Sequence, residues 1–346
     1  MHTDYELKIL DYLRRYPNSS SSEIHNGIQM PAELISTKRK LSNLVKAKII
    51  YKTGTGRATK YYINNNIKYT YPINIETYFN QDIDDRIIER FDIELIQTIL
   101  PKLELFSTGE INHLKKLHKK YIDNISTLSN TLYKKDLERL GIDLSWKSSQ
   151  IEGNTYSLLE TEQLLKESIE AKGKEKEEAI MLLNHKSALE YILDSPNYFL
   201  KIDLKKIIEV HSLLVQKLDV EKNIRTRLIG ITGTNYKPLD NEHQIKEAIE
   251  ATCNLVNLKD NVFEKAFILL LLLSYIQAFE DGNKRTARLM SNAVLISNNF
   301  CPISFRTVDS IDYKKAMLIF YEQNNTSAFK KIFMEQYEFA VNTYFQ

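Results

Sequence analysis

Apolar residues recur at helical spacing along most of the chain. Near its start they fall three or four positions apart, at Tyr5, Ile9, Leu10 and Leu13. This spacing predicts a helix, and Pro17 would end it. Ser20 and Glu23 then have the S-x-x-E spacing of a capping box, which predicts a second, short helix.

A third helix and a hairpin are expected next. Pro31 suits the first turn of a helix, and the apolar positions after it share one face: Leu34, Leu41, Leu44 and Val45. The runs 49–51 and 60–63 predict short strands on either side of the turn Gly54-Thr55-Gly56. This order of elements resembles a winged helix-turn-helix domain over residues 1–65. In such a domain the third helix enters the major groove and the wing touches backbone phosphates.

Charge strengthens this interpretation of the first segment. Residues 1–65 hold eleven Lys and Arg against five Asp and Glu, a net charge of +6, whereas the rest of the chain carries −4. Such asymmetry favours a module that faces nucleic acid. The candidate contacts to double-stranded DNA are Arg39, Lys40, Asn43 and Arg57. A winged helix that serves only protein contacts is the alternative.

The remainder is also expected to be helical. Residues 66–133 predict a connecting region with helices at 82–100 and 111–132, and residues 134–346 predict a second domain. The most apolar run, 266–276, is shorter than the ~20 residues that cross a bilayer, so we interpret it as a core helix. Gly and Pro are scarce, at 10 and 7 residues, which favours a mainly α fold.

Cysteine usage and the start of the chain indicate the compartment. Cys253 and Cys301 lie far apart, without a CxxC or HExxH partner, so we expect neither a zinc site nor a disulfide. The first residues lack the basic and then apolar profile of a signal peptide. We therefore expect a cytoplasmic protein with no membrane partner.

The segment 274–288, SYIQAFEDGNKRTAR, carries the clearest chemistry. An apolar helix ends in a short acidic loop, and a second helix is expected to begin at about Lys284. Unpaired backbone N–H groups at a helix start form an anion site, and Gly282 lets a phosphate approach closely. Arg285 and Arg288 add cationic donors on one helical face.

Asp281 is the candidate metal ligand in this segment. Magnesium prefers one or two carboxylates together with phosphate oxygens, so a carboxylate beside an anion site predicts Mg²⁺ bound with a nucleotide polyphosphate. A solvated basic helix start capped by Asn283 is the plain alternative.

The same segment resembles the Fic-family motif, H-x-F-x-(D/E)-G-N-(G/K)-R-x-x-R. The matching positions are Phe279, Asp281, Gly282, Asn283, Lys284, Arg285 and Arg288. The resemblance implies ATP and Mg²⁺ as ligands, and a nucleotide site that includes Gly282, Asn283, Lys284, Arg285 and Arg288. The departure is Gln277, which stands where the family has its catalytic histidine. In the family that histidine takes a proton from a target hydroxyl as the hydroxyl attacks the α-phosphate of ATP and accepts AMP.

Two further segments extend the resemblance over residues 134–346. Arg225 and residues 229–238 resemble the family's flap, a β-hairpin that holds a target protein by strand pairing, with Thr232, Gly233, Thr234 and Asn235 at its centre. Residues 148–153 match the family's inhibitory motif, (S/T)-x-x-x-E-(G/N), on a helix expected at about 135–153. Ser148 and Glu152 are four apart on one helical face, and Gly153 can end that helix in a left-handed conformation. In the family this glutamate pairs with the second arginine of the loop, here Arg288, and blocks productive placement of ATP.

Gln277 changes the expected activity. A glutamine amide cannot take up a proton at neutral pH, and loss of a general base costs about 10²- to 10⁴-fold in rate. The glutamine is either natural or an engineered inactivating change. His211 is a candidate histidine that could substitute, but its helical pattern, 207–218, favours a packed structural residue.

The fold expected from these observations is mainly α: a Fic-type helical core with a small β-hairpin flap, preceded by a winged helix-turn-helix domain. The leading hypothesis is an autoinhibited ATP-binding protein that is deficient in AMP transfer and has a DNA-binding regulatory head. An active adenylyltransferase that tolerates Gln277 by substrate-assisted deprotonation is the second hypothesis. A protein-interaction module without nucleotide is the third. The target protein, the DNA sequence and the formation of a homo-oligomer are left open.

Overall fold

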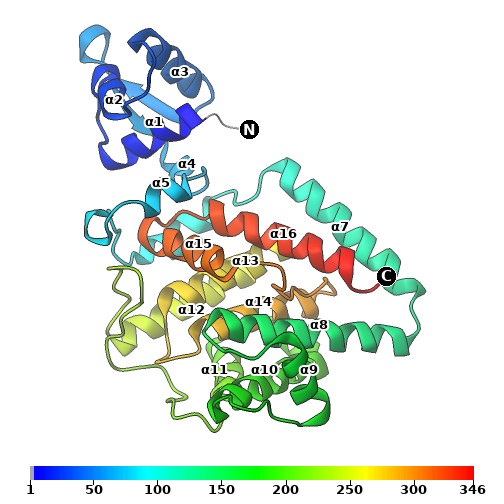
Figure 1. Cartoon of the computed structure of the whole chain (residues 1–346). Helices are drawn as coiled ribbons and strands as arrows, with labels where there is room; N and C mark the ends of the chain where they lie inside the picture. The colour runs from blue at the N-terminus through cyan, green and yellow to red at the C-terminus, as the bar shows by residue number, and fades with distance from the viewer. Residues whose placement is uncertain (1–3) are drawn as a thin grey trace. The chain divides into compact units, whose positions relative to one another are not determined.

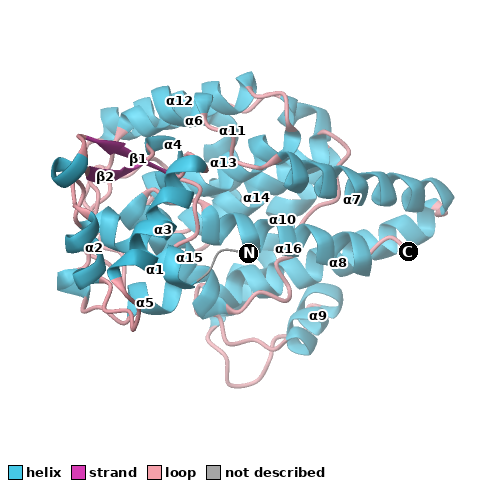
Figure 2. Ribbon diagram, turned by 90° about the horizontal axis from the view of Figure 1, so that it is seen from above, coloured by secondary structure: helices cyan, strands magenta, loops and turns pink. Residues whose placement is uncertain are grey.

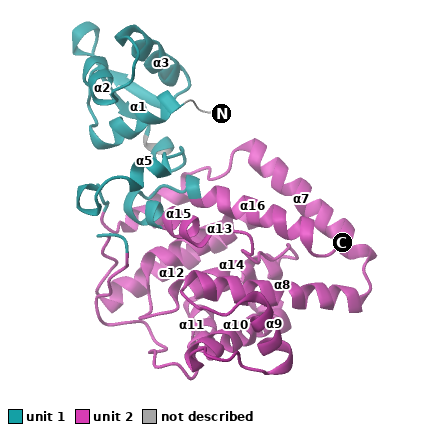
Figure 3. Ribbon diagram, viewed as in Figure 1, with its two compact units in different colours: residues 1–89, 233–235, 318–328 teal, residues 90–232, 236–317, 329–346 magenta. Residues whose placement is uncertain are grey.

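The computed structural model describes residues 4–346, so residues 1–3 of the predicted first domain lie outside the described residues. These residues are mainly helical and include one two-stranded sheet (Figure 1; Figure 2). The chain divides into two compact units (Figure 3). The first holds residues 1–89, 233–235 and 318–328, and the second holds 90–232, 236–317 and 329–346.

The first unit begins with three helices and a hairpin. Its elements up to residue 89 are α1 (Asp4–Arg15), α2 (Ser21–Gly27), α3 (Leu34–Lys46), β1 (Ile50–Thr53), the 3₁₀ turn η1 (Gly56–Ala58), β2 (Lys60–Ile63), α4 (Asn65–Lys68), α5 (Ile75–Phe79) and the 3₁₀ turn η2 (Ile83–Asp85). The strands are antiparallel, with Ile50 opposite Ile63 and Thr53 opposite Lys60. The predicted order of three helices and a hairpin is therefore confirmed.

Local chemistry explains where these helices start. Ser20 accepts from the backbone N–H of Glu23, whose side chain accepts from the backbone N–H of Ser20, so the predicted capping box is present. The third helix was predicted to start near Pro31, but it starts at Leu34. Glu33 is extended, with φ −77° and ψ 154°, and takes the cap position of α3. Pro31 therefore belongs to the turn before the helix.

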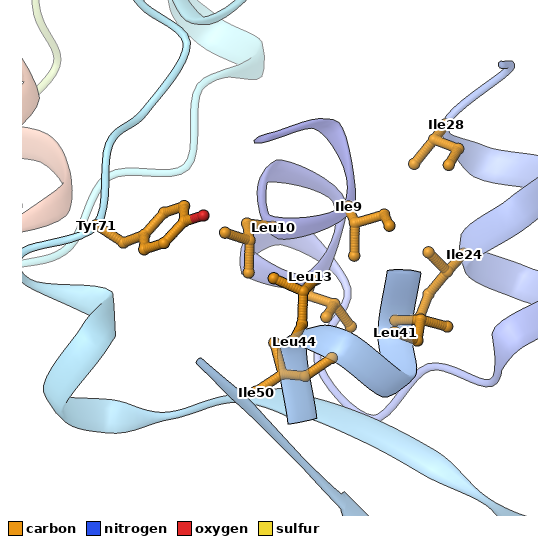
Figure 4. Close-up of a cluster of buried hydrophobic side chains, with 9 residues drawn as sticks. All are labelled: Ile9, Leu10, Leu13, Ile24, Ile28, Leu41, Leu44, Ile50 and Tyr71. Atoms are coloured by element: carbon orange, nitrogen blue, oxygen red, sulfur yellow. The ribbon is translucent and has the colours of Figure 1, made fainter. Parts of the chain in front are cut away.

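A small apolar core holds these elements together (Figure 4). It consists of Ile9, Leu10, Leu13, Ile24, Ile28, Leu41, Leu44, Ile50 and Tyr71. Figure 4 shows side chains from α1, α2 and α3 pointing toward one another, with Ile50 of the hairpin alongside. Each contributes burial worth about 1.5–3 kcal/mol relative to exposure, before the entropy of folding is counted.

The second unit is helical. Its elements are the π-helical turn η3 (Leu95–Ile99), α6 (Leu100–Lys102), α7 (Thr108–Thr127), α8 (Asn130–Ile151), α9 (Leu158–Glu167), α10 (Lys176–Asp194), the 3₁₀ turn η4 (Pro196–Leu200), α11 (Leu204–Leu214), α12 (Glu242–Leu258), α13 (Val262–Ile276) and α14 (Asn283–Ser297). The chain ends with α15 (Ser310–Gln323), which spans both units, and α16 (Ser327–Thr343).

Helix α13 is the centre of the second unit. Every residue from Ala266 to Ile276 is buried, and the helix packs against α12 and α14. The prediction of a core helix at 266–276 is confirmed. Within residues 4–346, no helix combines the length and apolar character that a membrane span requires. Because α13 is fixed on all sides, it gives the loop after it a rigid support.

One predicted helix is wrong, and another is confirmed only in part. The region 82–100 contains η2, where Asp82 caps a single 3₁₀ turn, then an irregular stretch, η3 and the first residue of α6. The region 111–132 is helical but is divided between two helices. Ser129 accepts from the backbone N–H of Leu132 and starts α8, while Leu128 is extended and ends α7.

The predicted β-hairpin flap is also wrong. Residues 229–238 form no strand, and the sheet of the described residues is the β1–β2 hairpin. The segment turns at Gly233, with φ +86°. The Gly233 carbonyl accepts from Arg86 Nη2 at 2.8 Å, and Asn235 donates to Asp84 at 2.9 Å. Side chains of residues 84 and 86 therefore hold the turn, where cross-strand pairing was expected.

Candidate nucleotide site

The loop between α13 and α14 is closed by its own side chains. Asn283 Nδ2 donates to the Phe279 carbonyl at 2.7 Å, and Asn283 Oδ1 accepts from the Phe279 N–H at 2.8 Å. Gly282 has φ +78° and caps α14, and its carbonyl accepts the first helical bond from Thr286 at 2.8 Å. The predicted helix start near Lys284 is confirmed. This geometry presents the backbone N–H groups of the first turn of a helix, which favour an anion.

Two buried arginines project from the first turns of α14. Arg285 is 1% exposed, and its Nη2 donates to Asp281 at 2.6 Å. Among the described residues, Nε and Nη1 of Arg285 and Nη1 of Arg288 have no hydrogen-bond partner. A buried donor without a partner costs about 1–3 kcal/mol, more when it is charged. An anion bound here would supply the missing acceptors, so these residues fit a phosphate group.

Glu152 forms ion pairs with two of the cationic side chains that the sequence assigned to phosphate. One carboxylate oxygen accepts from Arg288 Nη2 at 2.8 Å, and the other accepts from Lys284 Nζ at 3.2 Å. Arg288 also donates from Nε to Ser148 Oγ and from Nη2 to the Ser148 carbonyl, both at 2.9 Å. Helix α8 ends at Ile151, and Gly153 has φ +106°, the left-handed conformation that the sequence predicted. The predicted pairs of the motif are therefore in contact.

The ion pairs control the charge of Glu152. Burial favours the neutral acid, but Arg288 and Lys284 outweigh it and hold the pKa of Glu152 at about 2. The side chain of Glu152 is 18% exposed, so the pair is only partly screened by water. The glutamate is ionised at neutral pH and neutralises one charge of the cluster.

Gln277 is built into the end of α13. It is 6% exposed and left-handed, with φ +52° and ψ +58°. Its side-chain Nε2 donates to the Ser274 carbonyl at 2.6 Å, and its backbone carbonyl accepts from Arg225 Nε at 2.6 Å. The amide thus serves as a donor to one of the carbonyls that a helix end leaves without an intrahelical partner.

Arg225 joins this loop to the flap segment. Its backbone N–H donates to the Ala278 carbonyl at 3.0 Å, and its Nη1 donates to the Arg227 carbonyl at 2.6 Å. Its Nη2 donates to the Leu239 carbonyl. The buried guanidinium thus bonds to one residue before and one residue after the segment 229–238, which holds the two ends of this segment close to the loop.

Two buried histidines lie near the loop. His211 is fully buried on α11, and its Nε2 lies 3.0 Å from the Asp281 carbonyl oxygen. Burial lowers the pKa of His211, while the carbonyls of Asp281 and Lys222 oppose that effect. His185 is fully buried on α10; burial, with the charges of Arg288 and Arg285, lowers its pKa to about 3. The helical pattern at 207–218 predicted a packed structural residue at His211, and its burial on α11 confirms this, whereas no motif pointed to His185.

The predicted magnesium ligand lies at the edge of the loop. The Asp281 side chain is 63% exposed and pairs with Arg285. Among residues 4–346, no group of three or more His, Cys, Asp or Glu side chains could hold a metal by itself. Magnesium needs only one or two carboxylates when phosphate oxygens complete its shell, so Asp281 fits that ion in the company of a nucleotide.

The predicted DNA contacts lie in the first unit. Arg39 and Asn43 are exposed on α3, and Arg57 is exposed on η1 between the two strands. Lys40 differs from the others, since its Nζ pairs with Glu6 at 3.1 Å and its side chain is 22% exposed. The structure thus leaves Arg39, Asn43 and Arg57 accessible and engages Lys40 within the unit.

Comparisons with known proteins match part of this chain to one family. A sequence model described as the Fic/DOC family matches residues 201–295, which include Gln277 and Arg288. The chain is 28% identical over 159 residues to the protein adenylyltransferase fic-1 of Caenorhabditis elegans, covering 44% of this chain and 31% of that protein. It is 27% identical over 216 residues to the protein adenylyltransferase Fic of Nematostella vectensis, covering 58% of this chain and 50% of that protein. The chain thus spans at most half the length of these two relatives.

Solved structures agree on the fold. A fragment of Fic-1 from Caenorhabditis elegans matches with a TM-score of 0.59 at 20% identity, covering 68% of this chain and 70% of that one. A Fic domain containing signaling protein from Bacteroides thetaiotaomicron matches with a TM-score of 0.56 at 19% identity, covering 66% and 95%. By the match of the sequence model, the chain contains a Fic/DOC family domain at residues 201–295.

Proposed function

We propose that this chain binds ATP at the loop before α14, is held in an autoinhibited state by Glu152, and is deficient in AMP transfer because of Gln277. The observation that carries the proposal is the contact of one carboxylate with both Arg288 and Lys284. An internal anion lies where the phosphates of a nucleotide would be held. A surface glutamate without a regulatory role would have no reason to meet two cations of a helix N-terminus.

The residues of the loop have distinct roles in this proposal. The backbone N–H groups after Gly282 would bind phosphate oxygens, and Arg285 would donate from its unpaired nitrogens. Arg288 would hold the terminal phosphate once Glu152 has moved away. Asp281 would hold Mg²⁺, which supplies charge neutralisation to the phosphates when it is bound.

Deficiency in transfer follows from the chemistry of the available bases. The Gln277 amide does not take up a proton at neutral pH, and its Nε2 already donates to Ser274. Both ring nitrogens of His211 face carbonyl oxygens, at Lys222 and Asp281. A pKa of about 3 makes His185 a weak base. None of these side chains can replace the general base that the family uses.

The matching test measures binding and transfer separately. With labelled ATP and Mg²⁺, we expect weak retention by the unaltered chain, at least tenfold tighter retention by Glu152→Ala, and no covalent transfer by either. Glu162→Ala is the control, because Glu162 also pairs with a lysine, at 2.8 Å, but lies on α9. Covalent labelling of the unaltered chain would favour an active adenylyltransferase. Absence of ATP binding in Glu152→Ala would favour an interaction module.

A second proposed activity belongs to the first unit. Its three helices and hairpin, with exposed Arg39, Asn43 and Arg57, support binding to double-stranded DNA in the manner of a winged helix-turn-helix domain. The flap segment 229–238, whose base Arg225 holds near the loop, is the proposed docking place of a target protein. We propose a cytoplasmic regulator in which nucleotide binding and DNA binding share one chain.

A further inference from the structure

His211 contacts the loop in three places. Its Nε2 lies 3.0 Å from the Asp281 carbonyl oxygen, and its Nδ1 lies 3.1 Å from the Lys222 carbonyl oxygen. Its ring stacks on Phe279, with the ring centroids 3.6 Å apart and the planes within 5°. The side chain is fully buried on α11. His211 on α11 therefore contacts the loop at the Phe279 ring and the Asp281 carbonyl. It also contacts the Lys222 carbonyl, in the segment before Arg225.

The contact with Asp281 restrains one particular peptide group. The carbonyl of Asp281 and the N–H of Gly282 belong to the same planar trans peptide, so they point in opposite directions. When the carbonyl faces the His211 ring, the N–H of Gly282 faces away from it. Gly282 itself is left-handed, with φ +78°, a conformation in which a glycine peptide could otherwise rotate easily.

We propose that His211 is a positioning residue of the nucleotide site: it holds the peptide between Asp281 and Gly282 so that its N–H is available to a phosphate. This inference rests on the proposed nucleotide site. His211 does not touch the nucleotide and exchanges no proton with it. Its effect on affinity comes from fixing a backbone donor before the ligand arrives, which reduces the entropy lost on binding.

The chain contains a matched comparison for this role. His118 on α7 stacks on Phe300 with centroids 3.8 Å apart and planes within 6°, nearly the geometry of His211 on Phe279. Within the described residues, the Nδ1 of His118 has no hydrogen-bond partner. Stacking on a phenylalanine in this protein therefore does not require both ring nitrogens to lie within hydrogen-bond distance of a carbonyl oxygen, as they do at His211.

The test uses the full chain carrying Glu152→Ala, so that the internal carboxylate does not mask binding. His211→Phe keeps an aromatic ring on Phe279 and removes the ring nitrogens that face the two carbonyls, of which the neutral imidazole donates from one. His118→Phe makes the same side-chain change outside the site. We expect His211→Phe to raise the Kd for ATP with Mg²⁺ at least tenfold and to speed amide hydrogen exchange at 278–283. His118→Phe should leave both unchanged. His211→Gln, whose amide can donate, should recover part of the affinity.

Three outcomes would contradict the inference. Equal ATP affinity in Glu152→Ala with and without His211→Phe would overturn the role of His211 and leave the nucleotide site standing. An equal loss in His118→Phe would show a general effect of losing a stacked histidine. No ATP binding by Glu152→Ala itself would overturn the proposed function together with this inference. Should His211→Phe not fold, the same comparison with His211→Gln decides, because an unchanged Kd and exchange rate there also overturn the role.

Discussion

Single residues set the charge state of the proposed nucleotide site. Glu152 shares its two carboxylate oxygens between Arg288 and Lys284, and this arrangement keeps it ionised although it is largely buried. The Gln277 side chain only donates or accepts hydrogen bonds and takes up no proton at neutral pH. Under the proposed function, the site therefore has two separate defects as a transferase, one of access and one of proton transfer.

The first prediction concerns both defects. Gln277→His supplies a base with a pKa near neutrality, and Glu152→Ala frees Arg288 and Lys284 for phosphate. We expect the double variant to transfer labelled AMP at least about 100-fold faster than either single variant, because neither change repairs the other defect. The four combinations of these positions are compared by transfer of labelled AMP. If the double variant binds ATP but stays inert, other parts of the site have diverged too.

The second prediction concerns acid stability. The pKa of Glu152 is lowered from 4.5 to about 2 in the folded chain, so its pairing stabilises the fold above pH 4.5 and is lost as the pH falls toward 2. When the pH is lowered from about 5 to about 3.5, the unfolding free energy of the unaltered chain should fall by about 1 kcal/mol more than that of Glu152→Ala. Urea unfolding at both pH values measures this. Glu162→Ala is the control, and an equal pH response in both variants would refute the coupling.

At the scale of elements, the turn between α13 and α14 depends on local conformation as much as on composition. Asn283 bonds to both backbone groups of Phe279, and Gly282 takes a left-handed conformation that lets α14 start at once. Arg225 and His211 then hold the two ends of this turn, at Gln277 and Asp281. A short loop that is braced from both sides can present its N–H groups in one geometry.

The third prediction tests the conformation of Gly282. A Cβ at this position would meet His211 and Val215 at 3.5 Å, which is ordinary contact, so the expected cost comes from φ +78°. Gly282→Ala should lower the unfolding free energy by about 1–2 kcal/mol and weaken ATP binding in the Glu152→Ala background. Gly109→Ala is the control, because Gly109 lies in helix α7 without a positive φ and only Ser107 Oγ comes near, at 4.0 Å. A Gly282→Ala variant as stable as the unaltered chain would contradict this account.

On the scale of the whole molecule, charge is divided unevenly between segments. Residues 1–65 carry a net charge of +6 and the remainder −4. The Fic/DOC domain lies in the remainder, at 201–295. A net charge near zero for the whole chain therefore hides the basic composition of residues 1–65, the segment for which we propose DNA binding.

The fourth prediction follows from this division. The full chain should bind duplex DNA with an affinity that falls steeply as salt is raised, because Lys and Arg displace condensed counterions. Arg39→Ala should weaken binding and reduce the slope of log K against log salt by about 1 if Arg39 contacts a phosphate. Lys205→Ala is the control, because the Lys205 side chain is 78% exposed on α11. It should change neither the affinity for DNA nor the salt slope. No binding at low salt would assign the first unit to protein contacts.

The sequence by itself determined the local elements and the order of the motifs. The capping box at Ser20 and Glu23, the hairpin at 50–63, the core helix at 266–276 and the left-handed Gly153 all depend on neighbours within a few residues. Such short-range preferences are written in spacing and side-chain type. The pairing of Glu152 with Arg288 was expected only because two motifs that act on each other were present.

Tertiary structure decided what distant residues do to one another. Residues 229–238 have the alternation of a hairpin, yet Arg86 bonds to the Gly233 carbonyl and Asp84 to the Asn235 side chain, and no partner strand is present among the described residues. The ring of His211 meets Asp281 across 70 positions, and Lys284 joins Glu152 across 132. Contacts of this range depend on how α8, α11 and α14 pack, and helical periodicity gives the buried face of each helix without naming its partner.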